Sequence, residues 1–224
     1  MVTSLEFLAA KRLSCSRCQR AQTGCICQWI RATSTATEVL ILQHPMEVHH
    51  AKGSARLLSL SLSNSRIEVG ESFAPLRLQE LFTAPWLANT SAQAQKLPIL
   101  LYPELVHDAA QTTGAHRNFT PQEMANPANL RLIVIDASWR KSRKMLYLNP
   151  LLQRLPRLHL AEIPTSKYHI RKAQRADQLS TFEATCAALM QLEGENAAFD
   201  DLLTGFEGFV QQLMQPPAAT MPST

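Results

Sequence analysis

Three strongly apolar runs, each stopped by polar residues or proline, limit the folds that this chain can adopt. They cover residues 37–45, 96–103 and 129–136 and end in QHP, LYP and DASW. Strands that are apolar on both faces belong to parallel sheets with both faces covered. We therefore predict an α/β fold, in which a mostly parallel sheet is covered by helices. Apolar residues recur at helical spacing in five segments, and helices are predicted at residues 51–62, 78–84, 138–149, 180–193 and 199–215.

The same pattern predicts where a ligand binds. In open parallel sheets ligands bind outside the carboxyl ends of the strands, so a site is expected at the exits QHP, LYP and DASW. The sequence contains neither G-x-G-x-x-G after a strand nor G-x-x-x-x-G-K-[ST], which disfavours a dinucleotide fold and a P-loop. Shorter strands are predicted at residues 66–70 and 155–160, and a loop or short helix at 107–129.

Composition and the N-terminal sequence bear on where the protein works. Hydrophobic residues make up 46% of the chain, enough for a core. No apolar run is long enough to span a bilayer. The sequence MVTSLEFLAAKRL lacks an uninterrupted apolar segment with a small-residue cleavage site, so no signal peptide is expected. We expect a cytoplasmic protein that makes no membrane contact and is a monomer.

Four of the five cysteines lie close together, in the sequence CSRCQRAQTGCIC. The spacing C-x2-C-x6-C-x-C lets two pairs of thiolates reach one metal ion, which predicts a closed, structural Zn²⁺ site. Disulfides are disfavoured because the cytosol keeps thiols reduced, and a redox pair would leave two thiols unexplained. Cys186, alone on an apolar helix face, is interpreted as inert core. The proposed ligands are Cys15, Cys18, Cys25 and Cys27.

Charge is strongly segregated along the chain. Residues 136–175 hold ten Lys or Arg against two acids, and from residue 176 onward there are seven acids and no Lys or Arg. Solvated helix faces explain any single lysine, but a net charge of +8 over this segment favours a nucleic-acid partner. His44, His49 and His50 are interpreted as loop residues or phosphate contacts. The predicted RNA-binding residues are Arg140, Lys141, Arg143, Lys144, Arg171, Lys172 and Arg175.

The stretch IVIDASWRKSRKML brings a carboxylate, a hydroxyl and an indole to one strand exit. In a purely structural interpretation, Asp136 or Ser138 caps the following helix and Trp139 anchors the core. In the functional interpretation, the helix N-terminus presents N–H groups to an anion, Asp136 accepts a proton or binds an ammonium, and Trp139 stacks on a ring. A second turn, STFE, matches the S-x-x-E capping box through Ser180 and Glu183.

These pieces, taken in order, resemble one family. DASW is similar to the D-x-[ST]-W signature of DTW-domain proteins, and it is accompanied by a Cys cluster ending in C-x-C, LQHPMEVHHAKGSARLLSLSL, LLYP, SKYHIRK and LSTFEA. The resemblance runs from about Cys15 to about Leu192. It implies a tRNA-uridine aminocarboxypropyltransferase related to the SPOUT methyltransferases. Such an enzyme transfers the 3-amino-3-carboxypropyl group of S-adenosylmethionine to N3 of a tRNA uridine and releases methylthioadenosine.

The resemblance also implies an organisation and a set of roles. The expected organisation is an N-terminal helix with the cysteine module (residues 1–34), a SPOUT-like catalytic domain with a knotted C-terminal half (35–214), and a disordered tail (215–224). Asp136 is expected to act as the base or to orient the cofactor, Ser138 to hold the amino-acid portion of the cofactor, and Trp139 to pack the site. The loops expected to enclose the cofactor contribute Leu101, Tyr102, Pro103, Ile135, Asp136, Ala137, Ser138, Ser180, Thr181 and Glu183.

Two rival functions remain open. A methyltransferase would use the same cofactor in a different pose and would release S-adenosylhomocysteine instead of methylthioadenosine. A non-catalytic zinc-ribbon RNA-binding protein would need no small-molecule site at all.

Overall fold

The computed structural model describes residues 13–86, 95–103, 121–160 and 179–215, and the central element in this part of the chain is one parallel sheet. The strand order is β2-β1-β4-β3-β5, and every neighbouring pair is parallel. The predicted α/β fold is therefore confirmed at this level. The strands are β1 (Glu38–Gln43), β2 (Ser65–Val69), β3 (Leu97–Leu101), β4 (Leu130–Asp136) and β5 (Arg157–Leu158).

The helices lie close to the predicted positions, with differences at their ends. The second α-helix begins at Pro75, three residues before the predicted start, because proline is favoured in the first turn of a helix. A four-residue helix at residues 150–153 and the shortening of β5 to two residues were not predicted. The α-helices are α1 (Ala55–Ser61), α2 (Pro75–Thr83), α3 (Pro121–Met124), α4 (Trp139–Leu148), α5 (Pro150–Gln153), α6 (Thr181–Glu193) and α7 (Ala197–Met214).

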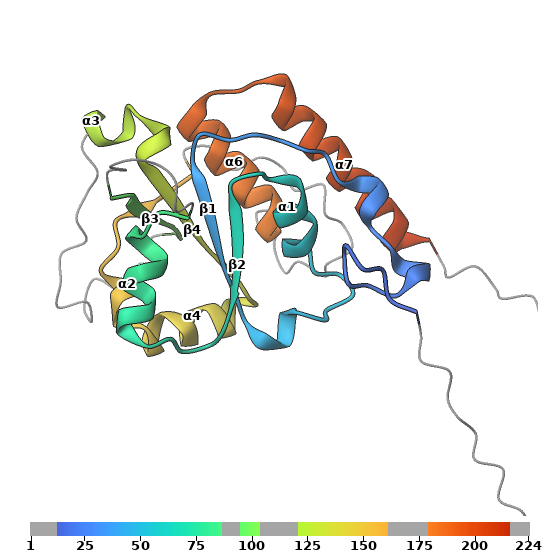
Figure 1. The fold of residues 1–224 in the computed structure, drawn as a ribbon, viewed down its shortest axis with the longest axis horizontal. Coiled ribbons are helices and arrows are strands. Elements are labelled where there is room, and N and C mark those ends of the chain that lie inside the picture. The colour runs from blue at the N-terminus through green and yellow to red at the C-terminus, as the bar shows by residue number, and fades with distance from the viewer. Residues whose placement is uncertain (1–12, 87–94, 104–120, 161–178, 216–224) are drawn as a thin grey trace, which may run out of the picture.

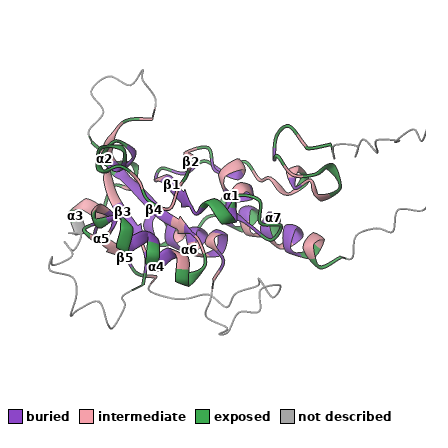
Figure 2. Ribbon diagram, turned by 90° about the horizontal axis from the view of Figure 1, so that it is seen from below, coloured by how far each residue is buried: buried purple, intermediate pink, exposed green. Residues whose placement is uncertain are grey.

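Each face of the sheet is covered by its own set of helices (Figure 1). Alternate residues of one strand enter different cores, so Val39 and Ile41 of β1 pack with α1, α6 and α7. Leu40 and Leu42 pack on the other face with α2, α4 and α5. Buried residues are concentrated on the strands and on the helix sides that face them (Figure 2). No helix in the described ranges is long and apolar enough to cross a membrane.

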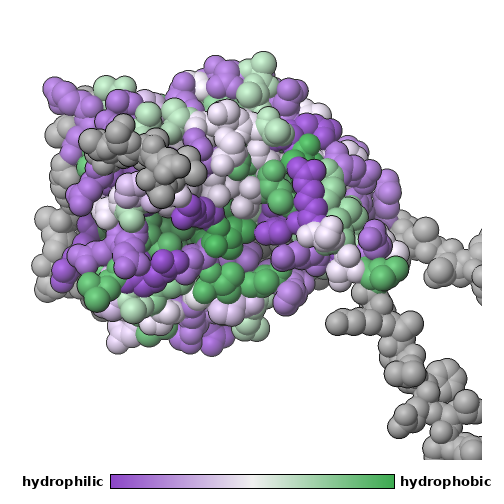
Figure 3. Space-filling model, viewed as in Figure 1, coloured by the Kyte–Doolittle hydropathy of each residue, from purple (hydrophilic) through white to green (hydrophobic). Residues whose placement is uncertain are grey.

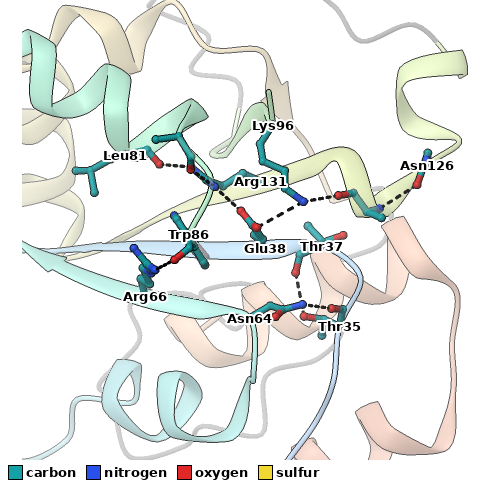
Figure 4. A network of polar contacts seen from close by, with 12 residues as sticks. Thr35, Thr37, Glu38, Asn64, Arg66, Leu81, Trp86, Lys96, Asn126 and Arg131 are labelled. Carbon is teal, nitrogen blue, oxygen red and sulfur yellow. Dashed lines mark hydrogen bonds and ion pairs between the residues drawn. The ribbon is translucent and has the colours of Figure 1, made fainter. Parts of the chain in front are cut away.

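A buried arginine organises the edge of the sheet where β1 and β4 begin (Figure 4). Arg131 is fully buried, and its guanidinium donates to Glu38 at 2.8 Å and to the carbonyl oxygens of Leu81 and Ala84. The Trp86 ring lies 4.5 Å from the same guanidinium. A buried charge is tolerated only when it is paired and hydrogen-bonded, and this set of contacts provides both.

The cysteine segment packs against the last helix (Figure 1). Cys18 and Ile26 belong to the same core as Phe206 and Phe209 of α7, and the Trp29 indole donates a hydrogen bond to Gln212. The side of α7 that meets Trp29 carries Gly205 and Gly208. A Cβ at Gly205 would lie 2.5 Å from the Trp29 carbonyl oxygen, so only glycine allows this approach.

We expect the substitution Gly208→Ala to destabilise the protein. The added Cβ would overlap the Trp29 ring, and the overpacking should cost about 1–3 kcal/mol, reduced by the roughly 1 kcal/mol that alanine gains in a helix. Urea unfolding measures the difference. Gly24→Ala is the matched control, because a Cβ there meets nothing within 4 Å. Equal stability of the two variants would contradict a close contact between α7 and the Trp29 ring.

Candidate active site at the carboxyl edge of the sheet

Three strand exits lie side by side at one edge of the sheet, as the sequence predicts. β1, β4 and β3 are consecutive in the strand order, and β1 and β4 continue into the 3₁₀ turn Pro45–Glu47 and into α4. This is the lower edge in Figure 1. In Figure 3, which is viewed from the same side as Figure 1, hydrophobic surface gathers just below the centre of the molecule. Met46, Val48 and Val69, which lie at or just after the strand ends, are exposed apolar residues.

Asp136, the last residue of β4, is buried and held by hydrogen bonds at both carboxylate oxygens. The Gln43 amide donates to Oδ2 at 2.8 Å, and the Thr181 hydroxyl donates to Oδ1 at 2.6 Å. Only 4% of Asp136 is exposed. The backbone of the same residue accepts a hydrogen bond from the His44 N–H at 3.0 Å. The carboxylate is thus fixed between β1, β4 and α6 instead of capping α4.

The two helices that begin beside Asp136 differ in how their N-termini are capped. At α6, the Ser180 hydroxyl accepts from the Glu183 N–H, and the Glu183 carboxylate accepts from the Ser180 N–H, so the predicted capping box is confirmed. At α4, Ser138 occupies the N-cap position but its side chain makes no cap hydrogen bond. The first N–H groups of α4 therefore keep the capacity to bind an anion.

Trp139 is not a core anchor, because 47% of it is exposed. Its ring meets the Tyr102 ring edge-on, with the centroids 5.8 Å apart. The Tyr102 hydroxyl lies 3.1 Å from the Ser142 hydroxyl, which donates to the Trp139 carbonyl oxygen. The exit of β3 and the first turn of α4 are joined through these contacts, and one side of an indole remains accessible to a ligand ring.

The four cations of α4 fall into two classes. Lys141 pairs with Glu47 at 2.8 Å, and Lys144 pairs with Glu71 at 2.9 Å. Arg140 and Arg143 are exposed and form no ion pair with any residue in the described part of the chain. The positive charge available to a partner on this helix is therefore concentrated on the two arginines.

His44 lies in the loop between β1 and the 3₁₀ turn, as predicted, but its burial disfavours the alternative of a phosphate contact. It is buried, its Nε2 lies 3.0 Å from Glu71, and its Nδ1 accepts from the Met46 N–H. Lys144 and His44 lower the pKa of the Glu71 carboxyl below its ordinary value, through hydrogen bonds that favour its charged form. Glu71 thus ties the exits of β1 and β2 to α4.

The four clustered cysteines come together as the spacing predicts. All four sulfur atoms lie within 4.8 Å of one another, with Cys15 to Cys27 at 3.7 Å and Cys18 to Cys25 at 3.8 Å. A tetrahedral zinc site with Zn–S bonds of about 2.3 Å has S···S edges of about 3.8 Å. The sulfur positions therefore suit a tetrahedral ion.

Backbone hydrogen bonds and burial act differently on these thiols. Contacts to the backbone of Cys18 and Arg17 lower the pKa of Cys15 to about 6, while burial raises the pKa of Cys27 to about 12. The turn that follows Cys18 places Gln19 at a positive φ of 61°. Cys186 is buried in the core, and burial raises its pKa, which agrees with the interpretation of an inert thiol.

The cysteine module is hydrogen-bonded to the loop that follows the 3₁₀ turn at the exit of β1. Arg20 donates to the carbonyl oxygens of Ala51 at 2.7 Å and Gly53 at 2.6 Å, and its guanidinium lies 5.3 Å from the Phe209 ring centroid. The loop that receives these bonds continues from the exit of β1. The cysteine cluster and the β1 exit are therefore physically connected.

The structure brings most predicted cofactor residues to one edge, where their roles stay predictions. Leu101 is the last residue of β3, Tyr102 and Pro103 follow it, and Ile135 and Ala137 flank Asp136. Arg171, Lys172 and Arg175 lie outside the described residues. The sequence placed Gln43 at an expected strand exit, QHP, but gave it no role; its signal was an amide after four consecutive apolar residues.

Comparisons with known proteins agree with the sequence resemblance. Residues 12–214 match the family described as DTW domain. The chain is 29% identical over 199 residues to the tRNA-uridine aminocarboxypropyltransferase 2 of Macaca fascicularis and to that of Mus musculus, covering 87% of this chain and 61% of each relative. It is 32% identical over 142 residues to the tRNA-uridine aminocarboxypropyltransferase A of Arabidopsis thaliana, covering 61% of this chain and 51% of the relative.

The chain spans about three-fifths of the length of the first two of these relatives. No solved structure matches it.

Proposed function

The chain belongs to the DTW domain family, and on that premise we propose that it transfers the 3-amino-3-carboxypropyl group of S-adenosylmethionine to N3 of a tRNA uridine. The observation that carries the proposal is the fixed Asp136 carboxylate, which lies beside an uncapped helix N-terminus at the sheet edge where ligands of such folds bind. The names of the relatives supply the substrate class.

The residues at this edge fit the cofactor. S-adenosylmethionine carries a carboxylate, an ammonium and an aromatic base, and when bound it supplies a sulfonium-activated carbon to the reaction. The N–H groups at the start of α4, with the Ser138 hydroxyl, suit the carboxylate. Asp136 suits the ammonium or the uridine N–H. The exposed indole of Trp139 suits an aromatic ring.

The protein contributes mainly positioning. Which carbon of the sulfonium reacts depends on which one is held in line with the nucleophile, so holding the amino-acid portion rigidly selects the product. Asp136 is already oriented by Gln43 and Thr181, so little reorganisation is required when ligands bind.

Methyl transfer is the rival reaction that would use the same cofactor and the same groups of the protein. It differs only in the pose of the cofactor, and the by-product therefore distinguishes the two reactions.

We also propose that the four clustered cysteines hold a structural Zn²⁺ ion, supported by the near-tetrahedral spacing of their sulfur atoms. A SPOUT-like knot in the C-terminal half is proposed as well. Its support is that β4 enters the sheet between two strands that precede it in the chain, β1 and β3. The residues that would form the knot include segments outside the described ranges, and an experimental structure that traces residues 104–120 and 161–178 tests it.

The proposed setting is the cytoplasm, where cysteines remain reduced and able to bind metal, and the proposed state is a monomer bound to tRNA.

The first experiment incubates the purified protein with S-adenosylmethionine and unmodified tRNA and identifies the by-product and the modified nucleoside by mass spectrometry. We expect methylthioadenosine and an acp-modified uridine. Asp136→Asn should lower turnover by about 100-fold or more while changing tRNA affinity less than twofold. Formation of S-adenosylhomocysteine would establish the methyltransferase alternative instead.

The second experiment measures tRNA binding as a function of salt for charge changes on α4. Arg143→Glu should weaken binding and reduce the slope of log K against log salt by about 1, because one phosphate contact is lost. Arg143→Lys keeps the charge and serves as the control with an unchanged slope. If both variants bind with the wild-type slope, Arg143 lies outside the tRNA interface.

The third experiment measures zinc by elemental analysis. The wild-type protein should hold about one ion per chain, and Cys18→Ser should lose it, since a closed tetrahedral site needs all four ligands. Cys186→Ala is the control, because this cysteine is buried in the core away from the cluster. Full zinc content in Cys18→Ser would contradict the four-cysteine site.

A further inference from the structure

Gln43 occupies the one position of β1 that faces Asp136 directly. The two residues are register partners at the ends of neighbouring parallel strands. The Gln43 Nε2 donates to Asp136 Oδ2 at 2.8 Å, and only 6% of Gln43 is exposed. It follows four consecutive buried apolar residues, which makes it the polar end of an apolar strand.

A buried amide at this position carries a cost that an apolar side chain would avoid. Desolvating an amide is unfavourable unless its hydrogen bonds are replaced within the protein. Here the replacement is a charge-assisted hydrogen bond to a carboxylate, which is stronger than a bond between neutral groups. The amide is therefore stabilised by the carboxylate that it contacts.

Gln43 acts together with a second donor on another element. The Thr181 hydroxyl, in the first turn of α6, donates to the other carboxylate oxygen at 2.6 Å. Two donors on opposite oxygens, from two different elements, fix the rotation of the carboxylate about its Cβ–Cγ bond. Either donor alone would leave that rotation less restricted.

We propose that Gln43 is a positioning residue for the transfer reaction, which it serves by fixing the carboxylate plane of Asp136 jointly with Thr181. The inference rests on the proposed function, because it assigns Gln43 to the same site. It also changes the role of Thr181. The sequence resemblance implied that Thr181 contacts the cofactor, whereas here its hydroxyl holds Asp136.

The kinetic test compares variants that keep or remove each donor. Gln43→Met keeps the side-chain length and removes the amide, and it should lower kcat about 10- to 100-fold while leaving tRNA affinity within twofold. Thr181→Val should act similarly, and Thr181→Ser, which keeps the hydroxyl, should retain activity within about threefold of wild type. These ranges follow from the roughly 100-fold cost of a 1 Å misplacement at a reacting centre.

A double-mutant cycle separates positioning from a purely structural role. If Gln43 acts through Asp136, Gln43→Met changes turnover less than twofold in the Asp136→Asn background. Wild-type kcat in Gln43→Met, or the same fold-loss in both backgrounds, overturns the inference. Thermal unfolding monitors folding, and if Gln43→Met does not fold, Thr181→Val and Thr181→Ser carry the same comparison.

A crystal structure of a variant tests this inference separately from the proposed function. In a crystal structure of Gln43→Met, the Asp136 carboxylate should rotate away from its wild-type plane. An unchanged plane overturns the positioning role, whatever reaction the enzyme catalyses. Absence of both methylthioadenosine and modified uridine in the wild-type assay would instead reject the proposed function. The plane of the Asp136 carboxylate in the variant would then still decide whether Gln43 positions Asp136.

Discussion

The pairing of β1 with β4 is the constraint on which the rest of the structure depends. Two side-chain pairs fix its register, one at each end and on opposite faces of the sheet. Glu38 lies opposite Arg131 where the strands begin, and Gln43 lies opposite Asp136 where they end. A slip of one residue would turn every side chain of the strand to the other face and break both pairs at once. The buried polar groups thus specify which alignment of two apolar strands forms.

The two ends of β4 use buried charge for different purposes. At the start, Arg131 is surrounded by Glu38, two carbonyl oxygens and an indole, which is an arrangement for stability (Figure 4). At the end, Gln43 and Thr181 each donate to one of the two carboxylate oxygens of Asp136, which lies beside the uncapped start of α4. The ordered carboxylate and the available N–H groups are what a small zwitterionic ligand requires.

Much of this arrangement follows from local sequence patterns. The apolar runs predict the strands, and the Ser180–Glu183 turn predicts the start of α6, because both depend on residues close together in the chain. The contact of Gln43 with Asp136 was not predicted because it depends on the register between β1 and β4, and the two residues lie 93 positions apart. The pairing of Lys141 with Glu47 and of Lys144 with Glu71 was missed for the same reason, and the charge pattern alone made all four cations of α4 look equivalent.

The contact between Trp29 and α7 has a consequence for the order of events during synthesis. Trp29 and Gln212 are 183 positions apart, yet their side chains share a hydrogen bond. At about 5–20 residues per second, roughly 10–40 s pass between the synthesis of the two. During that interval the cysteine segment leaves the ribosome without the aromatic helix that later covers it. An ion bound by the four thiolates would hold the segment folded over this time, so metal supply during translation, and not only in the finished protein, would govern the yield of folded protein.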